Sequence, residues 1–255
     1  TFAGTKERYK PIKKETTAKK KTHPLKTIKT LCRNKYFILI TLAFAVIYTS
    51  LGLTGGSRIY YAKYVLGDEM LNSTMTMFNY IPTILTIMLI PVFTKRFGKI
   101  KALFVGFLFY AAGLVLEIAG PVNLPMIYTG LVLQGIGHAA LYSCLFAIVG
   151  DVVDYSEWKD GIREEGITYS VTSFGQKIGT GLGTAALGWI LAAGHYDGTA
   201  AVQSASAIFA IKGLFLYLPL VITVIVLIIW YLFMGIDKIY PTVRKELDER
   251  REKAE

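Results

Sequence analysis

Residues 214–233 read LFLYLPLVITVIVLIIWYLF, a run that contains no charged side chain. A helix needs about 20 apolar residues to cross the hydrocarbon core of a bilayer. Five further apolar stretches precede this one, and the six predicted spans lie at about 36–56, 76–94, 101–120, 125–150, 167–193 and 210–235. Inside lipid, a segment of this length satisfies its backbone hydrogen bonds as a helix. The sequence therefore predicts an all-α membrane protein with six transmembrane helices.

The composition agrees with a membrane protein and argues against two other classes. Hydrophobic residues make up 53% of the 255 residues, and the formal net charge is +10. The basic residues stand at the ends of apolar stretches, which indicates membrane topology and no nucleic-acid partner. The two cysteines, Cys32 and Cys144, show no metal-binding spacing, so no metal site is expected. The three histidines, His23, His138 and His195, fall in different surroundings, and we expect no enzyme.

Charge also divides the chain into three parts. Residues 1–35 are polar and lysine-rich and are predicted to form a cytoplasmic central loop or linker. Residues 36–235 form the predicted six-helix bundle, and 236–255 a cytoplasmic tail. Most of the 28 Lys and Arg residues fall on the side of the two ends, whereas the opposite loops hold only Arg58 and Lys63. This bias predicts that both ends are cytoplasmic.

The fifth predicted span carries a polar stripe along one helical face. Ser173, Lys177, Thr180 and Thr184 recur at spacings of three or four residues, which places them on one side of a helix. A lysine halfway along a span is costly in lipid and marks either a functional site or an ion pair with another helix. Lys177, Ser173 and Thr180 are therefore candidate substrate-binding or coupling residues.

The nearly opposite face of the same span carries glycines at four-residue spacing. Gly175, Gly179 and Gly183 form a double GxxxG pattern. Glycine at these positions allows the backbone of a second helix to approach closely. The pattern predicts a tight helix–helix contact on this face.

The fourth predicted span has a second set of polar residues at four-residue spacing, namely Gln134, His138 and Tyr142. His138 has three readings: a side chain lining a cavity, a proton carrier, or ordinary packing. Tyr142 either stacks on a sugar ring or packs in the interior. Glu117, near the outer end of the third span, is expected to reach the membrane interface.

The segment between the fourth and fifth spans concentrates charge. Asp151 and Asp154 are three residues apart and lie near one face at the cytoplasmic end of a helix. Arg163 follows and is suited to bidentate pairing with carboxylates. These three residues form either a cytoplasmic gate, whose ion pairs change between conformational states, or a solvated loop with weak exposed pairs.

The same segment carries a resemblance to a known family. The runs DVVDYSEWK (151–159), GIREEGI (161–167) and SFGQKIG (173–179) resemble the glycoside–pentoside–hexuronide:cation symporter family. This is the melibiose-permease-like branch of the major facilitator superfamily. The run KRFGK (95–99) is similar to the short loop motif of the superfamily, but Lys95 replaces its usual acidic residue.

The resemblance covers essentially the whole chain and implies that it is the C-terminal six-helix bundle of a twelve-helix major facilitator fold, so that Thr1 follows a missing half. It implies that Lys177 matches a lysine set between sugar and cation. It also implies that Asp151, Asp154 and Arg163 match the family's cytoplasmic charge network. Tyr142 stands where melibiose permease has a tryptophan facing the sugar cavity.

The resemblance further implies the activity and the partners. We expect cation-coupled symport of a sugar or glycoside by alternating access, with Na⁺, H⁺ or Li⁺ as the coupling ion. The expected partners are the substrate, the cation, the missing N-terminal six-helix half and the lipid of a bacterial cytoplasmic membrane. The cation is expected to bind mainly in the missing half, and no cofactor is expected. The alternatives are a major facilitator carrier of an amino acid, drug or lipid, a membrane-embedded enzyme, and a non-transporting scaffold.

Overall fold

Helices account for all the regular structure that the computed structural model describes, which covers residues 31, 33–161, 163–200 and 202–252. Their bounds are α2 Lys35–Tyr64, α3 Leu71–Ile87, α4 Ile90–Phe97, α5 Lys99–Ala119, α6 Leu124–Asp160, α7 Glu165–Ala193, α8 Ala205–Lys212, α9 Leu218–Phe233 and α10 Gly235–Glu252. A π-helical turn, η2 Gly213–Tyr217, joins α8 to α9. The predicted linker at 1–35 lies almost entirely outside the described residues.

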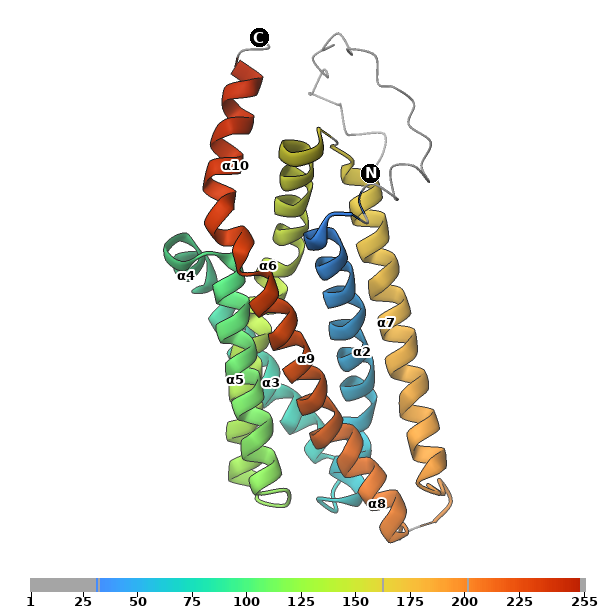
Figure 1. The fold of residues 1–255 in the computed structure, drawn as a ribbon. Helices are drawn as coiled ribbons and strands as arrows, with labels where there is room; N and C mark the ends of the chain where they lie inside the picture. The colour runs from blue at the N-terminus through green and yellow to red at the C-terminus, as the bar shows by residue number, and fades with distance from the viewer. Residues whose placement is uncertain (1–30, 32, 162, 201, 253–255) are drawn as a thin grey trace, which may run out of the picture.

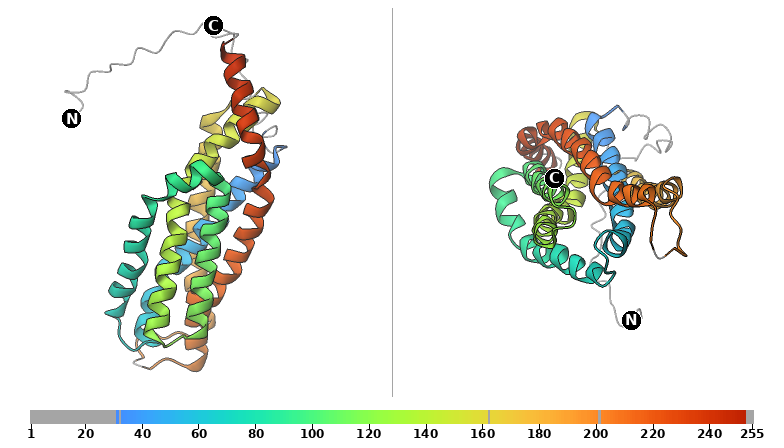
Figure 2. Two further views of the ribbon diagram at one scale, coloured as in Figure 1. Left: turned by 90° about the vertical axis from the view of Figure 1, so that its left-hand side faces the viewer. Right: turned by 90° about the horizontal axis from the view of Figure 1, so that it is seen from below.

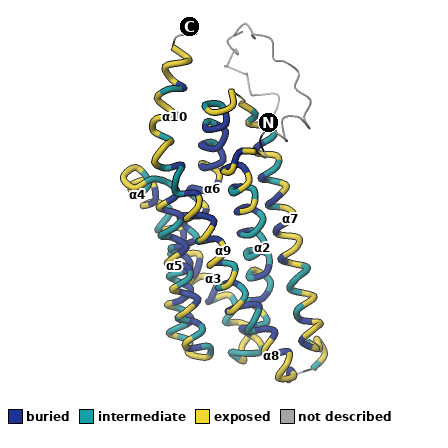
Figure 3. The backbone as a smooth tube through the Cα atoms, viewed as in Figure 1, coloured by how far each residue is buried: buried dark blue, intermediate teal, exposed yellow. Residues whose placement is uncertain are grey.

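The long helices run side by side from one end of the molecule to the other (Figures 1 and 2). α2 packs along α7, while α6 packs against both α5 and α3. α9 completes the bundle by packing on α5 and α2. Figure 3 shows that much of α6 is buried, whereas α7 and α10 are exposed along much of their length.

Four of the described helices, counting α8–α10 as one, are long and apolar enough to cross a membrane, and the bent pair α3–α4 makes a possible fifth. α7 has 29 residues but carries the polar stripe, and it is not among the helices that meet this measure of apolarity. The prediction of an all-α membrane protein is therefore confirmed. The exact number of six spans stays a prediction.

The second predicted span is broken. α3 and α4 are bent by 55° at Met88 and Leu89. Pro91 lies in the first turn of α4. Proline is tolerated there, because the backbone N–H groups of the first helical turn have no partner within the helix. Pro82 lies inside α3 without ending it.

The glycine face of α7 lies against α2. The Cβ atom of a residue replacing Gly175 would stand 3.3 Å from the backbone oxygen of Thr41. At Gly179 and Gly183 an added Cβ would overlap the backbone oxygens of Ala45 and Thr49. The three glycines therefore allow α2 and α7 to come into backbone contact.

Gly183→Ala is expected to destabilise the protein by about 1–3 kcal/mol, because the added methyl group has to push α7 away from α2. The measurement is thermal unfolding of the purified full-length protein in detergent. Gly181→Ala is the matched control, since a Cβ at Gly181 meets nothing within 4 Å. Equal stability of the two variants would show that the α2–α7 contact does not need glycine.

Two helices continue well past the predicted membrane boundaries. The fourth predicted span ends at about residue 150, but α6 remains helical to Asp160 and the chain reverses only at Gly161. The predicted tail is helical too: α10 projects beyond the bundle and packs on the end of α6 (Figure 1). Asp237 of α10 accepts hydrogen bonds from the backbone N–H groups of Ile100 and Lys101 and so caps α5.

Candidate functional site

The predicted polar residues fall into two separate sites within the bundle. The first is a cavity of about 260 Å³ between α2, α3 and α6, which we call the Arg58 cavity. Its lining is mostly polar and consists of Leu51, Thr54, Gly55, Arg58, Asn72, Thr76, Asn79, Tyr80, His138 and Tyr142. No carboxylate is among these residues.

His138 and Tyr142 both line the Arg58 cavity, one helical turn apart on α6. The ring of His138 lies 4.9 Å from the ring of Tyr110 and 5.8 Å from that of Tyr142. Tyr142 leaves 46% of its surface exposed. The structure therefore places two of the three predicted residues of this helix at a cavity wall, where Tyr142 is partly exposed.

Gln134, the third predicted residue of α6, is not part of this lining. Its amide donates a hydrogen bond of 2.7 Å to Oε1 of Glu117, and both residues are buried. The prediction that Glu117 reaches the interface is wrong, because Glu117 points into the α5–α6 contact, where Gly130 leaves room for its side chain. The second carboxylate oxygen of Glu117 has no hydrogen-bond partner in the part of the chain that the structure describes.

Arg58 was missed as a site residue because the apolar run ends at residue 56. α2 continues as a helix to Tyr64, so Arg58 lies within the bundle rather than in an outer loop. Its Nη1 donates a hydrogen bond of 3.1 Å to Oγ1 of Thr76. The signal available in the sequence was the helical spacing from Leu51 and Thr54 to Arg58, which places the three residues on one face.

The second site is a hollow on α7 of about 410 Å³, lined by Tyr169, Ser170, Ser173, Phe174 and Lys177. Lys177 is exposed there and has no ion-pair partner among the described residues. Thr180 is exposed one turn further along, where its hydroxyl donates to the backbone oxygen of Gln176. Ser173 and Lys177 thus share one open face, while the glycines of α7 occupy the buried face.

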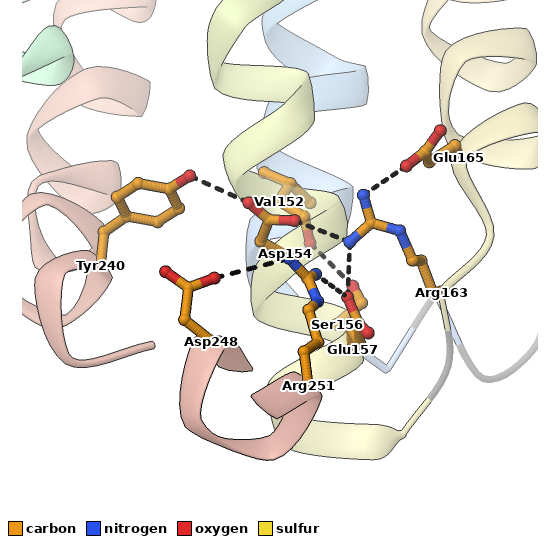
Figure 4. Close-up of polar contacts among 9 residues, drawn as sticks. All are labelled: Val152, Asp154, Ser156, Glu157, Arg163, Glu165, Tyr240, Asp248 and Arg251. Atoms are coloured by element: carbon orange, nitrogen blue, oxygen red, sulfur yellow. Dashed lines mark hydrogen bonds and ion pairs between the residues drawn. The ribbon is translucent and has the colours of Figure 1, made fainter. Parts of the chain in front are cut away.

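The charged residues form a network at the end of the bundle where α6, α7 and α10 meet (Figure 4). Arg163 Nη1 lies 2.9 Å from Asp154 and also contacts Glu157, while its Nη2 contacts Glu165. Asp154 accepts a further hydrogen bond of 2.9 Å from the hydroxyl of Tyr240. Arg163 and Asp154 are thus brought together, and α10 is part of the network.

The electrostatics of Arg163 follow from these contacts. Its partial burial acts to lower the pKa of the guanidinium, but hydrogen bonds to Glu157, Glu165 and Asp154 outweigh this and raise the pKa above its ordinary value. Arg163 therefore stays charged at any physiological pH. Its side chain is 40% exposed, so each of its ion pairs contributes little, about 0–1 kcal/mol.

Asp151 belongs to a different pair. Lys99 Nζ lies 2.7 Å and 2.8 Å from the two carboxylate oxygens of Asp151, whose side chain is only 8% exposed. Lys99 also lies over the ring of Tyr240, 5.4 Å from its centroid. The predicted trio of Asp151, Asp154 and Arg163 is therefore split between a partly buried pair and an exposed cluster, and Lys99, which is 34% exposed, is the partner that was missed.

No group of three or more His, Cys, Asp or Glu side chains suited to a metal ion occurs in the described ranges.

Comparison with known proteins identifies a matching family and several relatives of this chain. A family model described as MFS/sugar transport protein matches residues 1–238. The isoprimeverose transporter of Lactiplantibacillus pentosus is 32% identical, with 98% of this chain and 51% of the relative covered. The glucuronide carrier protein homolog of Escherichia coli strain K12 is 26% identical, with coverage of 88% and 50%.

The uncharacterized symporter YjmB of Bacillus subtilis strain 168 is also 26% identical, covering 88% of this chain and 49% of the relative. The chain thus spans about half the length of the curated relatives that it matches. The match covers most of the chain and agrees with the resemblance of the charged segment. The chain is therefore an integral membrane protein that belongs to the MFS/sugar transport protein family.

Proposed function

We propose that this chain is the C-terminal half of a secondary active transporter that carries a sugar or glycoside together with a cation. The observation that carries the proposal is the family match over residues 1–238, in a chain that spans about half of each relative. The names of the relatives include a sugar transporter, a glucuronide carrier homolog and a symporter. The proposal gives this chain the same class of activity.

In the proposed architecture, six spans form one bundle and a missing N-terminal bundle of six spans faces it. α7 is the fifth span, and its polar face meets the other half rather than lipid, which accounts for its low apolarity. Both ends are cytoplasmic because Lys and Arg concentrate on that side. The protein resides in a bacterial cytoplasmic membrane.

In the proposed mechanism, the substrate binds near the midplane between the two bundles, which rock about it to alternate access. The Arg58 cavity and the α7 hollow form the wall that this half contributes. Tyr142 offers an aromatic ring to a sugar, and His138, Ser173 and Thr180 are the further candidate binding residues, whereas the amide of Gln134 is bound to Glu117. The coupling cation, Na⁺, H⁺ or Li⁺, binds mainly in the missing half, and no cofactor takes part.

The network of Asp151, Asp154 and Arg163 is proposed as the inner gate, with Lys99 added to it. Its ion pairs join α6 to α5, to the start of α7 and, through Glu157 and Arg251, to α10. The pairs of Arg163 are exposed, and exposed pairs are weak and exchange readily, whereas the Asp151–Lys99 pair is less exposed. This property suits contacts that form in one state and break in the other.

The proposal is tested by uptake of labelled glycosides into cells that express the full-length gene, with and without Na⁺ and at two pH values. We expect cation-stimulated accumulation of one class of sugar. Accumulation of an amino acid, drug or lipid in place of any glycoside would identify a carrier of a non-sugar solute. A protein present in the membrane that accumulates no solute of the panel would contradict the transport proposal.

A further inference from the structure

Arg58 has a position that the bundle alone does not explain. It lies within α2, six residues before the helix ends at Tyr64. A cation placed among membrane-spanning helices is costly and is normally paired with a carboxylate or directed at a ligand. No Asp or Glu of the described residues lies within ion-pair distance of Arg58. Its charge is therefore available for a partner that this chain does not supply.

The guanidinium is oriented but not saturated. One hydrogen bond, from Nη1 to Oγ1 of Thr76, holds it, and Thr76 in turn donates to the backbone oxygen of Asn72. The Nε atom is buried and has no hydrogen-bond partner among residues 31, 33–161, 163–200 and 202–252. Arginine presents its N–H groups as a planar fork, which matches two oxygens of a carboxylate or a sulfonate at once. Thr76 thus orients the guanidinium group of Arg58, whose other N–H groups have no partner among the described residues.

Glu117 is the nearest competing explanation for Arg58. It is fully buried, and Gln134 occupies one of its oxygens. However, Glu117 does not line the Arg58 cavity, and it makes no ion pair with Arg58. The lining of the cavity therefore contains one positive charge, several neutral hydrogen-bonding groups and no carboxylate.

We propose that Arg58 recognises the negative charge of the transported solute, whose hydroxyl groups bind to the polar lining of the same cavity. The ligand class is a small hydroxylated solute with a carboxylate or sulfonate group, and a sugar acid fits this description. Asn72, Asn79 and Tyr80 of α3 supply donors and acceptors for hydroxyls. The cavity, about 260 Å³, is large enough for one sugar ring or a smaller solute. This inference rests on the proposed function and specifies its substrate class.

The test is equilibrium binding by the purified full-length protein of three probes that differ only at C6: methyl glucuronide, its 6-sulfonate counterpart and neutral methyl glucoside. We expect the Kd of at least one anionic probe to be lower than that of the neutral probe by at least about 30-fold, the discrimination typical of a desolvated charge pair. Arg58→Gln is expected to abolish this preference, because it raises the Kd of the anionic probes far more than the Kd of the neutral probe. Arg58→Lys retains a positive charge but not the planar guanidinium, and it is expected to keep part of the preference for anionic probes. The carboxylate and sulfonate probes show which anion fits.

Two control variants separate recognition from folding. Lys63→Gln removes a cation further along α2, where an exposed pair with Glu69 holds it, and is expected to preserve the anion preference. If Arg58 only balances Glu117, then adding Glu117→Gln to Arg58→Gln restores both thermal stability and the preference. We expect the double variant to regain stability at most, and not the preference.

Several outcomes overturn the inference without affecting the transport proposal. The first is a wild-type protein with equal Kd values for charged and neutral probes. The second is an Arg58→Gln variant with the wild-type ratio of neutral to anionic Kd. The third is an Arg58→Gln variant that loses affinity for all three probes by the same factor. Failure of the folded wild type to bind any of the three probes overturns it too. Binding of an anionic probe with no cation-stimulated uptake would instead contradict the symport proposal and leave the role of Arg58 intact.

Discussion

Lys99→Met is expected to destabilise the protein by about 2–3 kcal/mol, because it leaves the nearly buried carboxylate of Asp151 without a counter-charge, at a site that the one-third exposed Lys99 side chain leaves open to some solvent. Asp151 sits where α6 meets α5, and Lys99 holds both of its oxygens. A buried ion pair adds little net stability over an apolar pair, but removing one partner exposes the full desolvation cost of the other. The measurement is unfolding of the purified full-length protein in detergent.

Two further variants give this prediction its controls. Lys99→Met combined with Asp151→Leu is expected to recover most of the lost stability, since no charge then remains buried. Arg163→Gln removes a cation from the exposed network and is expected to cost less than about 1 kcal/mol per ion pair lost. If Arg163→Gln proved as destabilising as Lys99→Met, the contrast between the partly buried pair and the exposed cluster would be refuted.

The sequence predicted which segments are helices better than where these helices end. Hydropathy detects residues that face lipid or the core, whereas the backbone hydrogen bonds of a helix continue regardless of side-chain polarity. α2 therefore runs past its apolar stretch through Arg58, and α6 runs through Asp151 to Asp160. Both extensions bear charged residues of a candidate site, and at α2 the wrong helix end caused Arg58 to be missed as a site residue.

Helix faces were predictable as well, but their partners were not. The spacing of Gly179 and Gly183 indicated a contact face, and nothing in that spacing indicated α2 as its neighbour. Lys99 and Asp151 are 52 residues apart, and their pairing depends on how α5 and α6 cross. Likewise Glu117 is buried because Gly130 of α6 faces it. Such pairs depend on how helices pack against each other, and the spacing of residues within one helix does not predict which helix is its neighbour.

Lys177→Ala is expected to abolish cation-coupled accumulation by the full-length transporter, with a loss of about 30-fold or more in kcat/KM. Lys177 stands on the open face of α7 without an ion-pair partner among the described residues. We propose that it pairs with a carboxylate of the other half when no cation is bound there, and that the cation replaces it. Removal of the amine would leave that carboxylate uncompensated in a membrane environment, where an unpaired charge is costly.

The measurement is uptake into proteoliposomes as a function of the cation gradient, from which both rate and coupling ratio are obtained. Lys177→Arg retains the charge and is expected to keep part of the coupling, because the cation must still displace it. Lys212→Ala, which removes a lysine at the end of α8, is the matched control and is expected to leave the coupling ratio unchanged. A Lys177→Ala protein that transports with the wild-type ratio would show that the lysine has no part in coupling. In that case the polar stripe of α7 would serve only to join the two halves of the transporter.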